Sequence, residues 1–276
     1  MTVAVGIASP NVLIVAADSQ EDWGLLKRGS QKIRVEPVIR RGTEVLRGRI
    51  AIAGAGGSDY LEYLKSKIAH AVQQPSDASA DSFVDDVESA LEGEMTDFYD
   101  NHFAPVAHLD IHRDQEPSLI VAASLGGDRG LWRTHGSTVR RIAFGSDAVG
   151  SGAVWARMAL DTIAWRVVKE HTATLAACYA IYLAKESDGY CGKETHIVAL
   201  HETSPLMSPA DPDAIRAAEA VFRRYSEMQE VALNYMFTPG VMPAKVETNK
   251  HLKAFRRQLS ELNFYPVKRQ LDAGLQ

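Results

Sequence analysis

Thr2 is the first residue whose type and position suggest chemistry. Removal of Met1 is expected because the residue that follows it is small, and this would leave Thr2 with a free α-amine. Such an amine has an unperturbed pKa of about 7.7–8.0, so near neutral pH it can accept the proton of its own residue's hydroxyl. A threonine that uses its own amine as the base is an established nucleophile. Threonine is common at this position, so the feature predicts catalysis only together with others.

Asp18 and Lys32 are charged residues that could activate such a nucleophile. Asp18 ends the apolar run Val15–Ala17, and a carboxylate at the end of a buried strand needs a partner. Lys32 precedes the next expected strand, where it could pair with Asp18 and reach the Thr2 hydroxyl. Its positive charge would lower the pKa of both the amine and the hydroxyl. The alternative is an ordinary surface lysine at a strand edge.

A glycine-rich segment, residues 54–57, joins an expected strand to an expected helix. Glycines let the backbone approach a substrate closely. Backbone N–H groups near a helix N-terminus suit the binding of an oxyanion. A plain tight turn would explain the same residues.

Taken in order, these motifs resemble the proteasome β-subunit family, including its bacterial two-ring relative HslV, within the N-terminal nucleophile hydrolases. The resemblance covers about residues 2–202. Its motifs are Thr2 opening a strand, Asp18 in VAAD, Lys32 in QKI, AGAGG before a helix, Gly150-Ser151-Gly152 before another helix, and Asp188-Gly189-Tyr190-Cys191-Gly192 before the last strand. Each motif is modest, but six in the right order are specific.

The resemblance implies a role for each matching position. The implied roles are Thr2 as nucleophile, Asp18 as structural acid, Lys32 as activating lysine, Gly56 and Gly57 at the oxyanion and substrate site, and Ser151 and Asp188 as groups that hold the terminal amine. It implies no metal and no cofactor.

At two positions the sequence leaves open which side chains contact the Thr2 amine. Cys191 stands where many relatives carry a serine that contacts the amine, and a thiol is a weaker hydrogen-bond partner. Ser146 is an alternative to Ser151 for holding the amine.

The elements that must position these residues follow from hydrophobic periodicity. The sequence predicts strands at Thr2–Ile7, Val12–Ala17, Ile33–Val35, Arg49–Ala53, Leu119–Ala123, Gly130–Arg133, Arg140–Phe144 and Ile197–Leu200, with helices from Ser58, from Ser82, and over Ala153–Glu170 and Ala173–Lys185. This order of strands, two helices, strands, two helices and a strand favours an α+β layered domain over a doubly wound sheet. The resemblance implies a four-layer αββα sandwich of two antiparallel sheets.

The character of the chain changes near Ser204, where a proline-rich linker leads into helical sequence over Ala214–Met236 and from Asn249. We expect a proteasome β-type domain over residues 1–203 and a helical C-terminal extension over residues 204–276. The apolar stripes of these helices need a partner surface, and we expect them to pack between subunits.

Composition limits the binding partners and the cellular compartment that we expect for the protein. A net charge of −5 gives no reason to expect nucleic acid. Cys178 and Cys191 are too few for a disulfide framework, which suits a reducing, cytoplasmic setting. No apolar run is long enough for a membrane span. The absence of Lys and Arg before Lys27 argues against a signal peptide.

Two further patterns keep alternatives open. The acidic stretch Asp77–Asp100 contains no Lys or Arg and fits a solvated helix face, or a docking face for a basic partner. His108, Asp110, His112 and Asp114 alternate in a way that fits a solvated edge, or two metal-ligating histidines on one face.

The sequence therefore predicts a threonine-type endopeptidase that assembles into a homo-oligomeric ring or helical particle and cleaves unfolded proteins or peptides. No nucleotide-binding motif of the G-x-x-x-x-G-K-[ST] type occurs, so any unfolding would come from a separate AAA+ ATPase. The alternatives are a non-catalytic ring subunit and a small-amide hydrolase on the same fold.

Overall fold

The computed structural model describes residues 2–23, 26–30, 32–41, 45–73, 83–106, 116–161, 163, 169–201, 207–237 and 245–265. Chain contacts divide the protein into two compact units, Met1–Pro209 and Ala210–Gln276. The strands of the first unit are β1 (Val3–Ala8), β2 (Val12–Asp18), β3 (Gln20–Trp23), β4 (Leu26–Gly29), β5 (Arg34–Arg41), β6 (Val45–Ala55), β7 (Ser118–Leu125), β8 (Asp128–His135), β9 (Thr138–Arg141), β10 (Gly145–Gly150), β11 (Thr195–His201) and β12 (Met207–Pro209). Its α-helices are α1 (Ser58–Gln73), α2 (Phe83–Phe98), α3 (Ala153–Leu160) and α4 (Glu170–Ser187).

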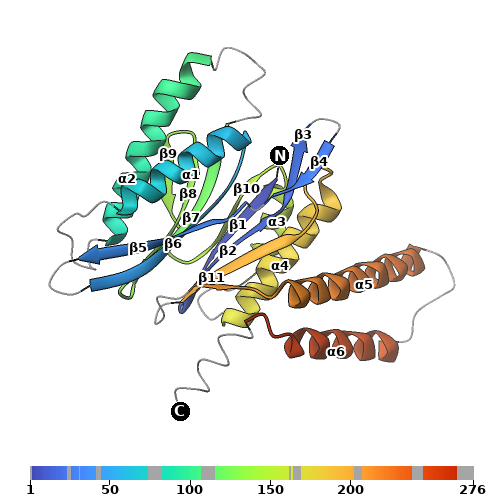
Figure 1. Cartoon of the computed structure of the whole chain (residues 1–276). Coiled ribbons are helices and arrows are strands. Elements are labelled where there is room, and N and C mark those ends of the chain that lie inside the picture. Colours follow the sequence, from blue (N-terminus) through green and yellow to red (C-terminus); the bar gives the residue numbers. More distant parts are fainter. Residues whose placement is uncertain are drawn as a thin grey trace. The chain divides into compact units, whose positions relative to one another are not determined.

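Two five-stranded sheets form the centre of the first unit (Figure 1). One has the strand order β10-β1-β2-β11-β12 and the other the order β5-β6-β7-β8-β9. Neighbouring strands pair antiparallel in both sheets. Strands β3 and β4 form a separate hairpin.

The two sheets pack face to face through small and branched side chains. The shared core comprises Ala4, Ala8, Leu13, Val15, Ala17, Ile33, Ala51, Ala53, Ala55, Ile120, Ala122, Leu131, Val149, Val198 and Leu200. Side chains alternate along a strand, so the other face of each sheet must be covered by different elements.

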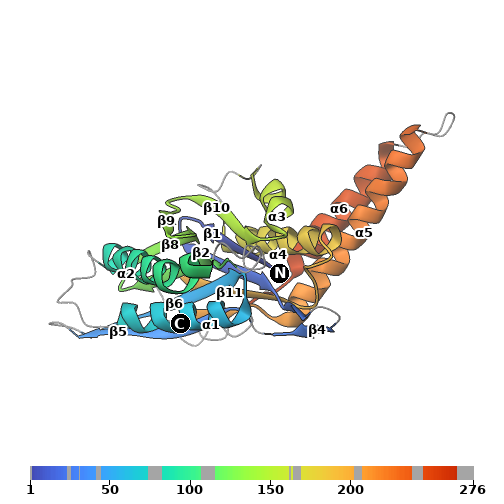
Figure 2. The same ribbon diagram turned by 90° about the horizontal axis from the view of Figure 1, so that it is seen from above.

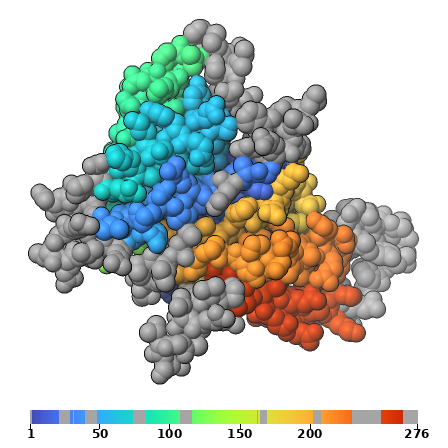
Figure 3. Space-filling model, viewed as in Figure 1, coloured from blue at the N-terminus to red at the C-terminus, as the bar shows by residue number. Residues whose placement is uncertain are grey.

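Helices cover the outer face of each sheet. Helices α1 and α2 lie side by side (Figure 3). They bury their apolar stripes with Ile52, Val121 and Trp132 of the β5–β9 sheet. The stripes predicted from sequence are the buried ones, Leu61, Leu64, Ile68 and Val72 on α1 and Val84, Val87, Leu91, Met95 and Phe98 on α2. Helix α4 packs on β1, β2 and β11, and α3 packs on β10 and β1. The predicted αββα sandwich is therefore confirmed.

Some elements differ from the sequence prediction. The predicted helix Ala153–Glu170 is wrong in extent, because α3 ends at Leu160 and Glu170 opens α4. Strand β10 was missed, since Gly145–Gly150 lacks the β-branched runs typical of strands. The β3–β4 hairpin lies in a polar stretch whose sequence gave no strand signal. Met207–Pro209, expected to be linker, pairs with β11 as an edge strand, where a proline is tolerated.

The second unit is a pair of helices, α5 (Pro212–Phe237) and α6 (Lys245–Glu261), which lie side by side (Figure 2). The Tyr225 and Phe255 rings meet edge to face with centroids 5.9 Å apart. The backbone N–H of Asp211, just before α5, donates to the carbonyl of Phe264, just after α6, at 2.7 Å. The two helices therefore run antiparallel. Within the described residues, no helix has the length and apolar character of a membrane span.

Gly150, the last residue of β10, allows this strand to pass against the start of β1. It pairs with Val3 and has φ of +99°, a conformation that favours glycine. A Cβ at this position would lie 2.0 Å from the carbonyl oxygen of Thr2 and 2.8 Å from Cβ of Ala55. The close approach of β10 to Thr2 thus requires a residue without a side chain.

We predict that Gly150→Ala destabilises the fold more than Gly127→Ala does. Gly127 has nearly the same φ, +98°, but a Cβ there would meet nothing within 4 Å. Gly127→Ala should therefore cost only the backbone strain, about 1–2 kcal/mol. Gly150→Ala should cost about 1–3 kcal/mol more from overpacking. Urea titration of both variants measures the difference, and equal losses of stability would show that the space around Gly150 is not restrictive.

Candidate active site

The pairing of β1 with β2 brings Thr2 to Asp18. The register joins Ala4 to Ala17, so the start of β1 lies beside the end of β2. The backbone N–H of Val3 donates to Oδ1 of Asp18 at 3.1 Å. Thr2, which directly precedes β1, therefore lies where the last residue of β2 presents its carboxylate.

The Thr2 hydroxyl lies between a carboxylate and an ammonium group. It donates to Oδ1 of Asp18 and accepts a hydrogen bond from Nζ of Lys32. The Lys32 ammonium also forms an ion pair with Asp18 at 3.2 Å. All three side chains are buried, with exposed fractions of 3% for Thr2, 0% for Asp18 and 7% for Lys32. The structure thus joins three residues that are 16 and 14 positions apart along the sequence.

Burial raises the pKa of Asp18 above its ordinary value, and the charge of Lys32 and the backbone donors Gly192 and Val3 oppose this rise. The carboxylate therefore depends on its partners to stay charged. Lys32, held by Asp18 and by the carbonyl of Gln20, places a positive charge on the Thr2 oxygen. Such a charge favours the deprotonated hydroxyl, which is the form that attacks a carbonyl.

The Asp188–Gly192 loop forms the other side of this site. Asp188 follows α4 directly, and the backbone N–H of Tyr190 donates to its Oδ1 at 2.9 Å. Burial alone would raise the pKa of Asp188, but hydrogen bonds from Ser151, Tyr190 N–H and Cys191 hold it below its usual value. Asp188 is thus a carboxylate suited to face a cation. The loop closes on the first group of residues where Gly192 N–H donates to Oδ2 of Asp18 at 2.9 Å.

Cys191 lies within this loop but is not suited to be a nucleophile. Burial and the nearby charges of Asp18 and Asp188 raise the pKa of its thiol to about 12. The thiol therefore stays protonated at neutral pH, and only a thiolate is reactive. Its Sγ lies 3.5 Å from Oδ2 of Asp188 and 4.0 Å from Oγ of Ser151. A Cβ at Gly152 would lie 2.7 Å from this Sγ and 3.1 Å from Cβ of Val3, so Cys191 borders the start of β1.

The β1–β10 register separates the two candidate serines. Gly150 pairs with Val3, so Ser151 follows at the end of β10 that adjoins Thr2. Ser146 pairs with Ile7, four residues along β1 from Val3, or about 13 Å at the usual strand rise. Ser151 is therefore the serine that lies near both Asp188 and the chain start.

Gly56 and Gly57 lie between β6 and α1, as the sequence predicted. Gly56 has φ of +134°, and the carbonyl of Gly57 accepts the N–H of Leu61 in the first turn of the helix. Ala55, just before them, borders the space at Gly150 that also touches the Thr2 carbonyl. These two glycines are thus near the Thr2 end of β1 and at a helix N-terminus, where backbone N–H groups attract negative charge.

Gln20 is a site neighbour that sequence reasoning missed, and Ser19, directly before it, supports the adjoining chain. Gln20 uses its backbone carbonyl to bind Lys32, and a backbone contact leaves no signature in residue type. Ser19 binds Glu194 with both its N–H and its hydroxyl oxygen, each at 2.9 Å. Only their position between Asp18 and Lys32 could have pointed to them.

Other sequence candidates lie elsewhere or outside the described residues. The alternating His and Asp residues from His108 to Asp114 fall outside them. In the part of the chain that is described, no group of three or more His, Cys, Asp or Glu is arranged to hold a metal.

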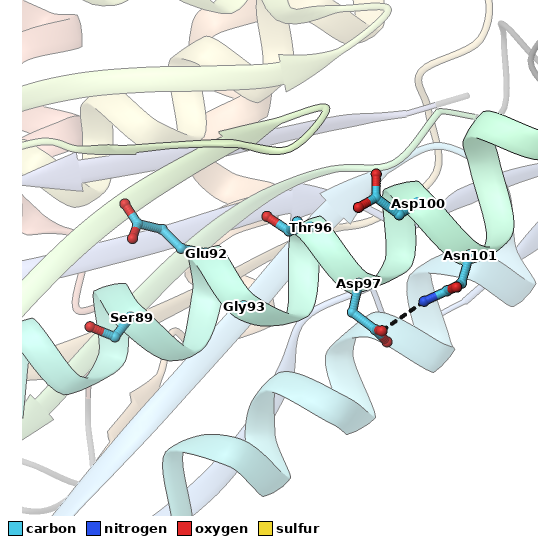
Figure 4. A pocket seen from close by; sticks show the side chains of 7 residues that line it. All are labelled: Ser89, Glu92, Gly93, Thr96, Asp97, Asp100 and Asn101. Carbon is cyan, nitrogen blue, oxygen red and sulfur yellow. Dashed lines mark hydrogen bonds between the residues drawn. The ribbon is translucent and has the colours of Figure 1, made fainter.

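A hollow of about 640 Å³ lies along α2 and the short π-helix Tyr99–Phe103 (Figure 4). Its lining comes from Ser89, Glu92, Gly93, Thr96, Asp97, Asp100 and Asn101. Asn101 donates to Asp97 at 2.7 Å, and the side chains project from one helical face. This is part of the acidic stretch, and its carboxylates are exposed, as both a solvated face and a docking face require.

No family model matches the chain, and no curated protein matches it in sequence. Solved structures do match. Anbu from Hyphomicrobium sp. strain MC1 aligns with a TM-score of 0.63 at 14% identity, over 87% of this chain and 100% of that one. Anbu, described as an ancestral beta-subunit, from Yersinia bercovieri gives 0.60 at 11% identity, over 87% and 100%. Eukaryotic HslV from Trypanosoma brucei gives 0.51 at 18% identity, over 72% and 99%. The chain therefore has the proteasome-like fold of Anbu and HslV.

Proposed function

We propose that the protein is a threonine-type endopeptidase with Thr2 as its nucleophile after removal of Met1. The observation that carries this proposal is the buried Thr2 hydroxyl held between the Asp18 carboxylate and the Lys32 ammonium. A lysine that is only 7% exposed and contacts a threonine hydroxyl is costly to maintain as a charged group. Use of that charge to activate the hydroxyl accounts for the cost.

In the proposed reaction, the Thr2 oxygen attacks the carbonyl carbon of a peptide bond and its proton passes to the Thr2 α-amine. Lys32 stabilises the negative charge on the attacking oxygen. The N–H of Gly56, with Gly57 beside it, binds the oxyanion of the tetrahedral intermediate. The amine then gives the proton to the leaving amine, which leaves an acyl-enzyme. Water, activated by the same amine, hydrolyses this ester and frees Thr2.

Asp188 and Ser151 are proposed to hold the terminal amine, with Cys191 beside them. The depressed pKa of Asp188 supports this role, because a carboxylate that stays charged attracts an ammonium group. The protonated thiol of Cys191 can supply a weak hydrogen bond at the same place.

A proteasome-like assembly is part of the proposal. HslV and Anbu have the same fold, and one matching structure, with a TM-score of 0.61 at 14% identity, is the helical assembly of the Anbu complex from Pseudomonas aeruginosa. We propose that copies of this chain form a homo-oligomeric ring or helix in the cytoplasm. Its substrates would be unfolded proteins or peptides, delivered where needed by a separate AAA+ unfoldase.

Met1 should be absent from the active protein. An amine that is acylated by Met1 cannot accept a proton, so the proposed base exists only after this residue is removed. Intact-mass spectrometry should show a chain lighter by one methionine, and amine-selective labelling should mark Thr2. Full peptidase activity in a preparation that retains Met1 would rule out the amine as base.

Thr2→Ala should abolish peptide cleavage and labelling by a threonine-directed covalent inhibitor. Lys32→Ala should lower kcat by about two to four orders of magnitude, the scale expected for loss of part of a nucleophile unit. Lys65→Ala is the matched control, because Lys65 is also buried but pairs with Glu62 on α1 at 2.8 Å. The control should keep kcat within about twofold. Activity above one tenth in Thr2→Ala would point to another nucleophile, and an inhibitor-inert parent would indicate a non-catalytic subunit.

The helical unit is proposed to contribute to assembly. Deletion after Pro209 removes α5 and α6 but keeps β12, which pairs with β11 and belongs to the first unit. Size-exclusion chromatography with light scattering should show particles with fewer subunits than the full-length protein forms. An unchanged number of subunits would exclude this unit from the assembly contacts.

A further inference from the structure

Gln20 contacts both sides of the candidate site. Its backbone carbonyl accepts a hydrogen bond from Nζ of Lys32. Its side-chain Nε2 donates to the carbonyl of Gly189 at 3.3 Å. The residue is only 5% exposed, so water does not compete freely for either of these hydrogen bonds. One buried residue therefore joins the lysine to the Asp188–Gly192 loop.

The other end of the Gln20 amide packs against the same loop. A Cβ at Gly192 would lie 2.3 Å from Oε1 of Gln20. Gly192 is also the residue whose N–H binds Asp18 at 2.9 Å. The amide thus spans the loop from Gly189 to Gly192 and fills the space beside the contact that closes the loop on Asp18.

We propose that Gln20 is a positioning residue for the Thr2 reaction, an inference that rests on the proposed function. Its side chain fixes the loop that carries Asp188, while its backbone fixes Lys32. Together with the contact from Gly192 to Asp18, Gln20 thereby holds the amine-holding carboxylate in place relative to the activating lysine. Proton transfer needs the base within about 2.6–3.2 Å of the hydroxyl, so movement of the carboxylate that holds the amine would slow the reaction.

The expected effect is on kcat. Gln20→Ala keeps the carbonyl that binds Lys32 but removes the amide that holds Gly189. Loss of one hydrogen bond and the resulting looseness of the loop should lower kcat about three- to tenfold, with KM unchanged. Amide hydrogen exchange of residues 189–192 should become faster, because their anchor to β3 is lost.

Ser19→Ala is the matched control. Ser19, which directly precedes Gln20, binds Glu194, just after the Asp188–Gly192 loop, and its carbonyl accepts the N–H of Ser30. Its loss should lower the melting temperature in the same way as loss of Gln20 but leave kcat within about twofold. A fall in kcat that follows the melting temperature in both variants would make Gln20 merely structural and would overturn the proposal.

A double-mutant cycle isolates the contact between the Gln20 side chain and Gly192. Gly192→Ala keeps the N–H that binds Asp18, but its methyl group would displace Oε1 of Gln20, so kcat should fall. In the double variant with Gln20→Ala there is no side chain to displace, and kcat should be no lower than in Gln20→Ala alone. Fully additive losses would show that the two residues act independently and would contradict the inference.

The exchange measurement separates the two hypotheses. An unchanged exchange rate at residues 189–192 in Gln20→Ala would overturn the positioning role even if the parent is an active peptidase. A different outcome is faster exchange in Gln20→Ala together with a parent protein that neither cleaves peptides nor reacts through Thr2. That outcome would refute the proposed function, and the catalytic role of Gln20 with it.

Discussion

The buried ion pair between Asp18 and Lys32 is the interaction on which the rest of the site depends. Neither charge is stable alone in an interior with 0% and 7% exposure, and removal of one partner from such a pair is strongly destabilising. The carboxylate gathers its donors from three directions: Val3 on β1, Lys32 before β5 and Gly192 before β11. Each donor brings one segment of the chain to the end of β2.

The packing of the four layers holds these segments in place around the site. The alanine-rich core lets the two sheets approach closely, and Gly150 lets β10 reach the Thr2 backbone. Helix α4 delivers Asp188 at its C-terminal end, and α1 begins directly after Gly56 and Gly57. Rigid strands and helix ends, rather than long loops, therefore set the geometry around the hydroxyl.

Much of this arrangement could be predicted from the sequence. The stripes on α1 and α2 have clear helical periodicity, and β1 and β2 are apolar runs broken by a turn, so these elements were found. Strand β10 and the β3–β4 hairpin were missed because their residues are small or polar and their strand conformation comes from pairing with neighbours. Thr2, Asp18 and Lys32 carry side chains whose chemistry is visible in a sequence. Gln20 was missed because half of its contacts involve its backbone, and the finding that Ser151, rather than Ser146, follows the residue paired with Val3 needed the register of β10.

The spread of these contacts along the chain has a consequence for biosynthesis. The Asp18 carboxylate, which accepts a hydrogen bond from the Thr2 hydroxyl, also needs a hydrogen bond from the N–H of Gly192. Gly192 leaves the ribosome long after the N-terminal strand does. The Asp188 loop and the strand that follows it come equally late. A nascent chain that ends before them presents a threonine without its full surroundings and so should be inert. For the peptidase proposed above, the order of synthesis would thus delay hydrolysis until nearly all of the first unit has emerged, which would protect the polypeptides being made nearby.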